Sequence, residues 1–309
     1  MRIEENVMPS MSHQCTQCPR ACGVDRGAGE CGYCGVPWGF RVARASLHQW
    51  EEPSISGTRG SGTIFFSGCN LRCVFCQNRV ISHESMGREL DAEGLSNVML
   101  RLRDAGAHNI NLVTPTPYAY QLAEVLSRVK PTLGVPVVYN CGGYESVETL
   151  RRLEGLVDVY LPDFKYFGAD CASRYSDAED YHAVATEALA EMLRQTGEVQ
   201  FDGDGMILRG TIVRHLVLPA NRSDSIALLN DLAERFGTRR FLLSLMSQYT
   251  PTFAGDCAYP ALRRRVTTFE YDAVLKAAQD LGFEGYFQSR ESATAEYTPD
   301  FADGGYLRI

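Results

Sequence analysis

The sequence predicts an α/β protein: an open, partial (β/α)6 barrel with a small N-terminal, cysteine-rich, metal-binding segment. From residue 62 onward, short apolar runs alternate with helical stretches of ten or more residues. That alternation is typical of βαβ units built around a parallel sheet. Six strands precede a final short one, which is too few to close an eight-stranded barrel.

The chain divides where its composition changes. Residues 1–12 are expected to be disordered. Residues 13–57 are rich in Cys, Gly and Arg and lack apolar periodicity, so we expect a small domain held by metal rather than by a core. The barrel is expected over residues 58–290, followed by a C-terminal tail over residues 291–309.

The strands and helices of the barrel follow one another in regular order. The predicted strands are GTIFFSG (62–68), NINLVT (109–114), VPVVYN (135–140), VDVYLPDF (157–164), GTIVRHLVLP (210–219), RFLLSLMSQY (240–249) and the short GYFQS (285–289). The predicted helices lie within residues 89–106, 118–129, 146–155, 182–197, 225–237 and 272–282. In barrels of this kind the site lies at the C-terminal ends of the strands.

Composition excludes several classes of function. The formal net charge of −8 argues against nucleic acid as a partner, since such binding needs a basic surface. No run of eighteen apolar residues occurs, so no membrane partner is expected. The N-terminus MRIEENVMPS is too polar for a signal peptide, and we expect a cytoplasmic protein.

Three cysteines follow the first predicted strand with the spacing Cys69-x3-Cys73-x2-Cys76. Clustered thiolates favour an iron–sulfur cluster, zinc or copper. A structural zinc site needs a fourth ligand, for which His83 is the nearest candidate. A cubane on three cysteines instead leaves one iron without a protein ligand, open to a substrate or cofactor.

This spacing, with Phe75 just before the third cysteine and βα repeats after it, resembles the radical S-adenosylmethionine (SAM) superfamily. The resemblance implies a [4Fe–4S] cluster on the three cysteines, with SAM chelating the open iron. It implies reductive cleavage of SAM to a 5′-deoxyadenosyl radical, which removes a hydrogen atom from the substrate. An electron donor such as flavodoxin or ferredoxin is implied as a partner.

Further segments are similar to the pyruvate formate-lyase activating-enzyme-like group, which is related to the glycyl-radical activases. They are the Gln77-Asn78 pair after the third cysteine and the segments VVYNCGGY, VDVYLPDFKY and IVRHLVLP. The resemblance implies that six residues lie near SAM: Phe75, Asn78, Asn140, Asp163, Lys165 and Arg214. The partner of Arg214 is either the SAM carboxylate or Asp163, because a charge inside an apolar strand must be paired.

One segment departs from the superfamily pattern. The second strand ends in LVTPTPY (112–118) and not in the Gly-Gly-Glu that commonly binds the SAM amino group. Thr114 and Thr116 are candidates to supply acceptors in its place. After the fourth predicted strand, the polar tract 165–182 is either a lid or a solvated loop.

The N-terminal segment CTQCPRACGVDRGAGECGYCG offers a second set of thiols. Cys15, Cys18, Cys22 and Cys34 would close a site for zinc or a second Fe–S cluster and stabilise a segment with almost no core. Cys31 is a spare that could replace Cys34. A redox disulfide is a further alternative. This segment also resembles the activating-enzyme-like group.

Three functions follow from these patterns. The first is an enzyme that cleaves SAM and installs a glycyl radical on a protein partner. The second is a radical SAM enzyme that acts on a small molecule or peptide by another route, favoured by the altered second strand and the added cysteine segment. The third is a non-catalytic, metal-binding interaction protein, although such a protein has no chemical need of three clustered thiolates.

Overall fold

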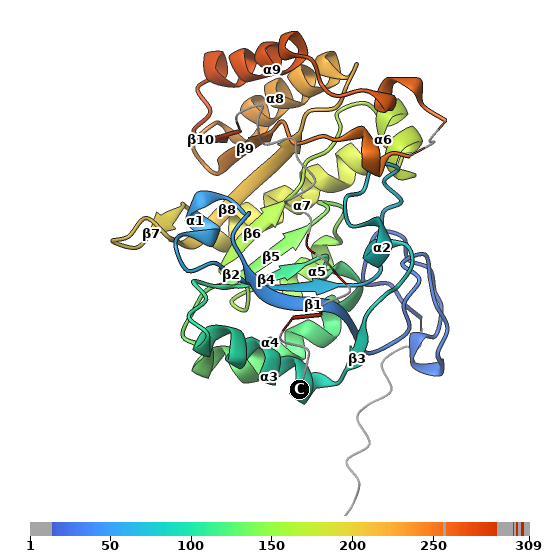
Figure 1. The fold of residues 1–309 in the computed structure, drawn as a ribbon, viewed down its shortest axis with the longest axis vertical. Helices are drawn as coiled ribbons and strands as arrows, with labels where there is room; N and C mark the ends of the chain where they lie inside the picture. Colours follow the sequence, from blue (N-terminus) through green and yellow to red (C-terminus); the bar gives the residue numbers. More distant parts are fainter. Residues whose placement is uncertain (1–13, 256–257, 289–298, 300, 302–303, 306–309) are drawn as a thin grey trace, which may run out of the picture.

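One open sheet runs through the molecule in the order β10-β9-β8-β6-β5-β4-β2-β1-β3 (Figure 1). The computed structural model describes residues 14–255, 258–288, 299, 301 and 304–305, so the predicted N-terminal stretch 1–12 and most of the tail 291–309 lie outside it. The parallel strands are β2 (Ser61–Phe66), β4 (Ile110–Val113), β5 (Val137–Cys141), β6 (Val159–Pro162), β8 (Ile207–Leu216), β9 (Leu242–Met246) and β10 (Gly285–Phe287). The predicted α/β fold with an open, largely parallel sheet is confirmed.

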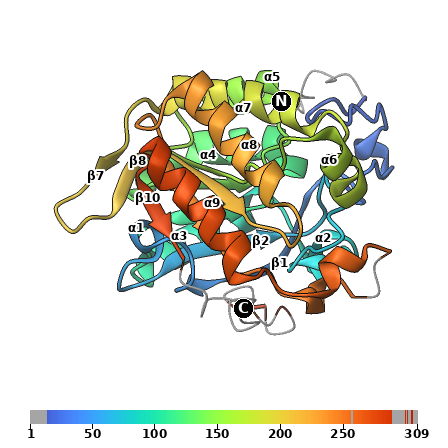
Figure 2. The same ribbon diagram turned by 90° about the horizontal axis from the view of Figure 1, so that it is seen from above.

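Helices cover the outer face of this sheet, as Figure 2 shows from above. The longer ones are α3 (Ala92–Asp104), α4 (Ala119–Leu133), α6 (Ala169–Ser176), α7 (Tyr181–Thr196), α8 (Arg222–Phe236) and α9 (Thr268–Leu281), with the short α5 (Val147–Arg152) between them. In α3 the residues buried against the sheet recur at helical spacing; they are Leu95, Val98, Met99 and Leu102. Within the described part of the chain, no helix has the length and apolar character that crossing a membrane requires.

The sheet begins earlier than the predicted start of the barrel at residue 58. Strand β1 (Phe40–His48) pairs antiparallel with β2 on one side and with β3 (Arg88–Leu90) on the other. Its buried positions occur in adjacent pairs as well as singly, and its pairing with β2 shifts register between Val42 and Arg44, as at a β-bulge. Part of the predicted cysteine-rich segment therefore belongs to the sheet.

The next turn of chain fills the interior of the barrel. Helix α1 (Pro53–Ser56) carries Ile55, which is fully buried in a cluster formed by strand residues that face inward. The Asn109 side chain donates a hydrogen bond to the Ile55 carbonyl at 2.7 Å. The β1–α1 segment thus plugs the barrel and brings residues 49–52 to the floor of the cavity above.

Candidate functional site

Three predicted residues lie on the inward face of neighbouring strands and contact one another. Arg214 on β8 donates to the Asp163 carboxylate from Nε (2.9 Å) and to the Asn140 side-chain oxygen from a terminal nitrogen (2.5 Å). A third donor of Arg214 reaches Glu51 Oε2 at 3.3 Å. The predicted pair of Arg214 with Asp163 is therefore present, and the guanidinium is held by three acceptors.

Lys165 completes this ion network at the rim. Its Nζ lies 2.5 Å from Asp163 Oδ2, and both side chains are largely buried. Burial alone would raise the pKa of Asp163, but the cations of Arg214 and Lys165 outweigh burial and hold that pKa below its ordinary value. For Lys165, burial is opposed by Asp163 and by the nearby thiolate of Cys73, and its pKa is raised.

The three-cysteine loop is fixed by its backbone. Val74 N–H donates to the Tyr175 carbonyl at 2.9 Å, and Arg72 N–H donates to the Ser176 carbonyl at 3.3 Å. The side chain of Asn70, which is almost fully buried, donates to the Tyr144 carbonyl at 2.6 Å. The tract 165–182, predicted as a lid or a loop, therefore packs against the cysteine loop through the end of α6.

The three thiols share one buried environment. Cys73 Sγ lies 3.0 Å from Ser176 Oγ, and Cys76 Sγ lies 3.3 Å from Ser82 Oγ. Burial raises the pKa of Cys69, and the neighbouring Cys73 and Cys76 raise it further. The like charges of three thiolates this close need a cation between them, and iron supplies one.

A cavity of about 200 Å³ joins the cysteine loop to the ion network. The predicted site residues that line it are Cys73, Phe75, Cys76, Asn78, Asn140, Asp163, Lys165 and Arg214. Cys69 and Thr114 are not among the lining residues. Thr114 has a left-handed backbone (φ 58°), and Thr116 donates instead to buried Glu145 at 2.6 Å. That the lining residues contact SAM remains a prediction.

The residues present suit a cubane better than a single ion. No group of three or more His, Cys, Asp or Glu side chains among the described residues is arranged to hold one metal ion. A cubane joins three thiolates through three different irons, so its ligands need not converge on one point. His83, the candidate fourth zinc ligand, does not line the cavity, and burial lowers its pKa to about 4.

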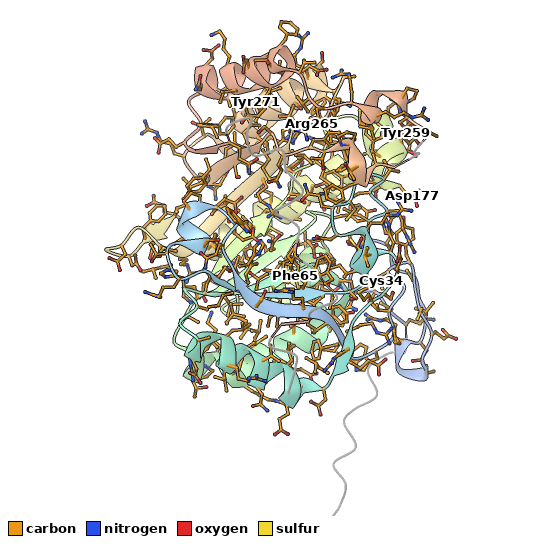
Figure 3. All side chains as sticks on the ribbon, viewed as in Figure 1. Cys34, Phe65, Asp177, Tyr259, Arg265 and Tyr271 are labelled. Atoms are coloured by element: carbon orange, nitrogen blue, oxygen red, sulfur yellow. The ribbon has the colours of Figure 1, made fainter. Side chains whose placement is uncertain are left out.

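The N-terminal cysteines lie at the same end of the sheet as the three-cysteine loop, where Figure 3 shows Cys34. The two segments touch: Arg20 Nε donates to the Asn70 carbonyl at 2.9 Å, and Arg72 donates to the Tyr33 carbonyl at 2.9 Å. A side chain at Gly68 (φ 79°) would meet the Cys34 carbonyl at 2.7 Å, so glycine is required there. The N-terminal segment is thus docked on the loop.

Two of the N-terminal thiols, Cys18 and Cys34, have raised pKa values. Burial raises the pKa of Cys18 to about 12, with Cys34 and Cys15 among the smaller causes. Burial also raises the pKa of Cys34, and Cys15 and Cys22 add to it. Cys22 and Cys31 are both exposed, and Cys31 is not among the causes of either shift. In the part of the chain that the structure describes, these thiols are not arranged to hold a single metal ion, and zinc or a second Fe–S cluster on this group stays a prediction.

Cys15→Ala is expected to lower the melting temperature, by about 5 °C or more, because a structural metal supplies folding energy to a segment with little core. Differential scanning fluorimetry of the anaerobically purified protein measures it, with exposed Cys31→Ala as the control. An unchanged melting temperature combined with lost activity would favour an electron-relay cluster.

Sequence reasoning missed the floor of the cavity. Glu51 lines it, bonds to Arg214 and accepts from the Asn111 side chain at 3.1 Å. Trp50, at 58% exposure, stands at its mouth, and His48 also lines it. The acidic pair after Trp50 is the available signal, but it lies within residues 13–57, which the sequence predicts as the cysteine-rich segment and not as part of the barrel.

A buried carboxylate outside the cavity gives a pH-dependent prediction. Burial raises the pKa of Glu145 to about 7, although hydrogen bonds from Thr116 and Tyr139 oppose the rise. In the unfolded chain the Glu145 carboxyl has its ordinary pKa of 4.5. The folded protein therefore loses stability as the pH rises from 4.5 through 7, because the buried carboxyl resists ionisation. Glu145→Gln removes this loss, and the variant should gain about 3 kcal/mol relative to wild type across that window.

Urea unfolding at pH 5 to 8 measures this gain, with exposed Glu187→Gln as the control. A difference between Glu145→Gln and wild type that stays constant with pH would contradict the assignment.

Comparison with known proteins relates part of this chain to a described family. Residues 63–198 match the family described as the Radical SAM superfamily. A curated relative, "Uncharacterized protein MJ0674" of Methanocaldococcus jannaschii, is 28% identical over 286 residues, which cover 90% of this chain and 78% of the relative.

Two solved structures show partial likeness. SuiB of Streptococcus suis, bound to precursor peptide SuiA, is 10% identical with a TM-score of 0.49, covering 72% of this chain and 46% of SuiB. The FeFe-hydrogenase maturase HydG of Carboxydothermus hydrogenoformans is 12% identical with a TM-score of 0.43, covering 75% of this chain and 58% of HydG. The chain thus spans about half the length of these two proteins, and at these scores they add nothing to the family match. Residues 63–198 thus match the Radical SAM superfamily model, and a [4Fe–4S] cluster with SAM-based radical chemistry is what this match implies.

Proposed function

We propose that the protein is a radical SAM enzyme whose cluster is held by Cys69, Cys73 and Cys76. The observation that carries the proposal is the shared cavity: two of these thiols and the Asn140–Asp163–Lys165–Arg214 network line the same space. Cys69, Cys73 and Cys76 would hold a [4Fe–4S] cluster, which when bound and reduced would supply the electron for reductive cleavage of SAM. The reductant would be an external electron donor of the flavodoxin or ferredoxin class.

The residues of the chain have separate parts in this proposal. Phe75 and Asn78 border the cavity beside the thiols and would contact the SAM nucleoside. Arg214 would hold the SAM carboxylate together with its present acceptors, since a guanidinium offers five donors. Thr114, Cys15, Cys18, Cys22 and Cys34 keep the roles expected from the sequence as proposals, and none of them is needed to explain the cavity.

Anaerobic reconstitution with iron and sulfide tests the proposal directly. The reconstituted protein is expected to show [4Fe–4S] absorbance and, after reduction, to convert SAM to 5′-deoxyadenosine and methionine. Absence of both cluster and product would contradict an enzymatic role and leave the metal-binding interaction protein as the surviving alternative.

For the hydrogen donor, we propose a glycine of a partner protein, as in glycyl-radical activation. The support is the sequence similarity at Gln77-Asn78, Asn140 and Arg214, together with an open sheet. The alternative of a small-molecule or peptide substrate is supported by the LVTPTPY strand and by the N-terminal segment over the rim. Electron paramagnetic resonance after incubation with a candidate glycyl-radical enzyme distinguishes them: a glycyl radical supports activation, and its absence despite SAM cleavage supports the alternative.

A further inference from the structure

A second, smaller cavity continues the proposed site. Its volume is about 100 Å³, and it lies between the β1–α1 segment and strands β8, β9 and β10. It shares five lining residues with the first cavity, namely Trp50, Glu51, Arg214, Met246 and Gln248. A ligand anchored in the smaller cavity would therefore extend into the larger one.

Glu52 gives this smaller cavity an unfilled hydrogen-bond acceptor. The residue is only 8% exposed, and its Oε2 atom is buried without a hydrogen-bond partner among the described residues. A hydrogen bond with Ser244 engages the carboxyl group but leaves that atom unpaired. An uncompensated buried carboxylate is costly, so a bound group that donates to it would be stabilised.

The charges around the two cavities are unequal. Their described lining contains three carboxylates, Glu51, Glu52 and Asp163, and two cations, Lys165 and Arg214. Both cations are bound by Asp163, and Arg214 also by Glu51. Among the described residues no ion pair joins either cation to Glu52, whose pKa is raised by burial and lowered by the more distant charge of Arg214. Trp50 and Tyr286, which also line the smaller cavity, carry ring faces that attract cations.

We propose that the smaller cavity is a subsite for a primary ammonium group of the substrate, with Glu52 as the residue that selects for it. The excess carboxylate, its unpaired oxygen and the aromatic lining all favour a cation with N–H donors. The small volume suits a short alkylammonium group. The inference rests on the proposed function in one respect. The part of the substrate beyond its ammonium group would react in the larger cavity, where SAM is proposed to bind.

Binding of n-propylammonium chloride to the reconstituted full-length protein tests the subsite, with neutral n-propanol as the matched probe. Saturation-transfer NMR titrations are expected to show n-propylammonium binding at least tenfold more tightly than n-propanol. Glu52→Gln should weaken n-propylammonium at least tenfold, whereas Glu89→Gln on the exposed β3 should leave it unchanged. Saturating SAM should not displace the probe.

Equal binding by wild type and Glu52→Gln, or displacement of the probe by SAM, would overturn the inference. If Glu52→Gln fails to fold, Ser244→Ala replaces it, and unchanged binding in that variant counts equally against the subsite. The 5′-deoxyadenosine assay is independent of these titrations. Failure of SAM cleavage with Glu52-dependent probe binding would refute the proposed function alone, and the reverse result would refute the subsite alone.

Discussion

Cys73→Ala is expected to reduce the formation of 5′-deoxyadenosine from SAM to background. Cys73 is the middle ligand of the proposed cluster and the most buried of the three thiols, and it lies at the cavity beside Lys165. Removing one of three thiolates leaves a second iron without a protein ligand, and the cluster is no longer held in a fixed position. Product is measured by liquid chromatography after anaerobic reconstitution and reduction.

Cys171→Ala is the matched control for this variant. Cys171 is a partly buried thiol on α6 that lies 3.1 Å from Asn221 and does not line the cavity. It should retain both iron content and SAM cleavage. Retained cleavage in Cys73→Ala would refute the assignment of the cluster to this loop.

Arg214→Met is expected to give the largest loss of stability, about 3–5 kcal/mol in the free energy of unfolding. The substitution keeps the side chain's length but leaves Asp163 and Glu51 buried without their shared cation. Urea unfolding at pH 7 measures the loss. Lys276→Met, which breaks an exposed pair with Asp280, is the control and should cost at most about 1 kcal/mol.

The pH dependence separates this explanation from a packing defect. The pKa of Asp163 is held low in the folded protein, so the stability gained from its cations is present above the ordinary carboxyl pKa. That stability is lost as the pH falls through the lowered value. The difference between Arg214→Met and wild type should therefore shrink in acid, and a difference independent of pH would indicate lost packing instead.

The parallel strands were predictable because each is a short apolar run between a turn and a helix. The same alternation explains why Asn140, Asp163 and Arg214 could be expected on one face: a polar residue in a buried strand is stable only when it faces a site or a partner. The family match then agrees with the cysteine spacing. For the parallel strands and for these three residues, the local sequence is enough to make the prediction.

The floor of the site could not be predicted in this way. Strand β1 reads FRVARASLH, with two arginines among its apolar positions, and its pairing with β2 depends on residues some twenty positions away. Ile55 is a single apolar residue whose burial arises only when five strands surround it. Glu51 and Glu52 consequently gained their place in the site from tertiary packing, which no short pattern encodes.

The plug formed by α1 has a consequence for how the protein can be divided. Although the cysteine-rich segment looks like a detachable module, the chain that leaves it supplies a sheet strand and then enters the barrel interior. Truncation at residue 57 would remove the floor and both floor carboxylates. A chimera that exchanges the N-terminal module between relatives would have to keep the native chain from Phe40 onward, so the unit that can be exchanged ends before β1 and not at residue 57.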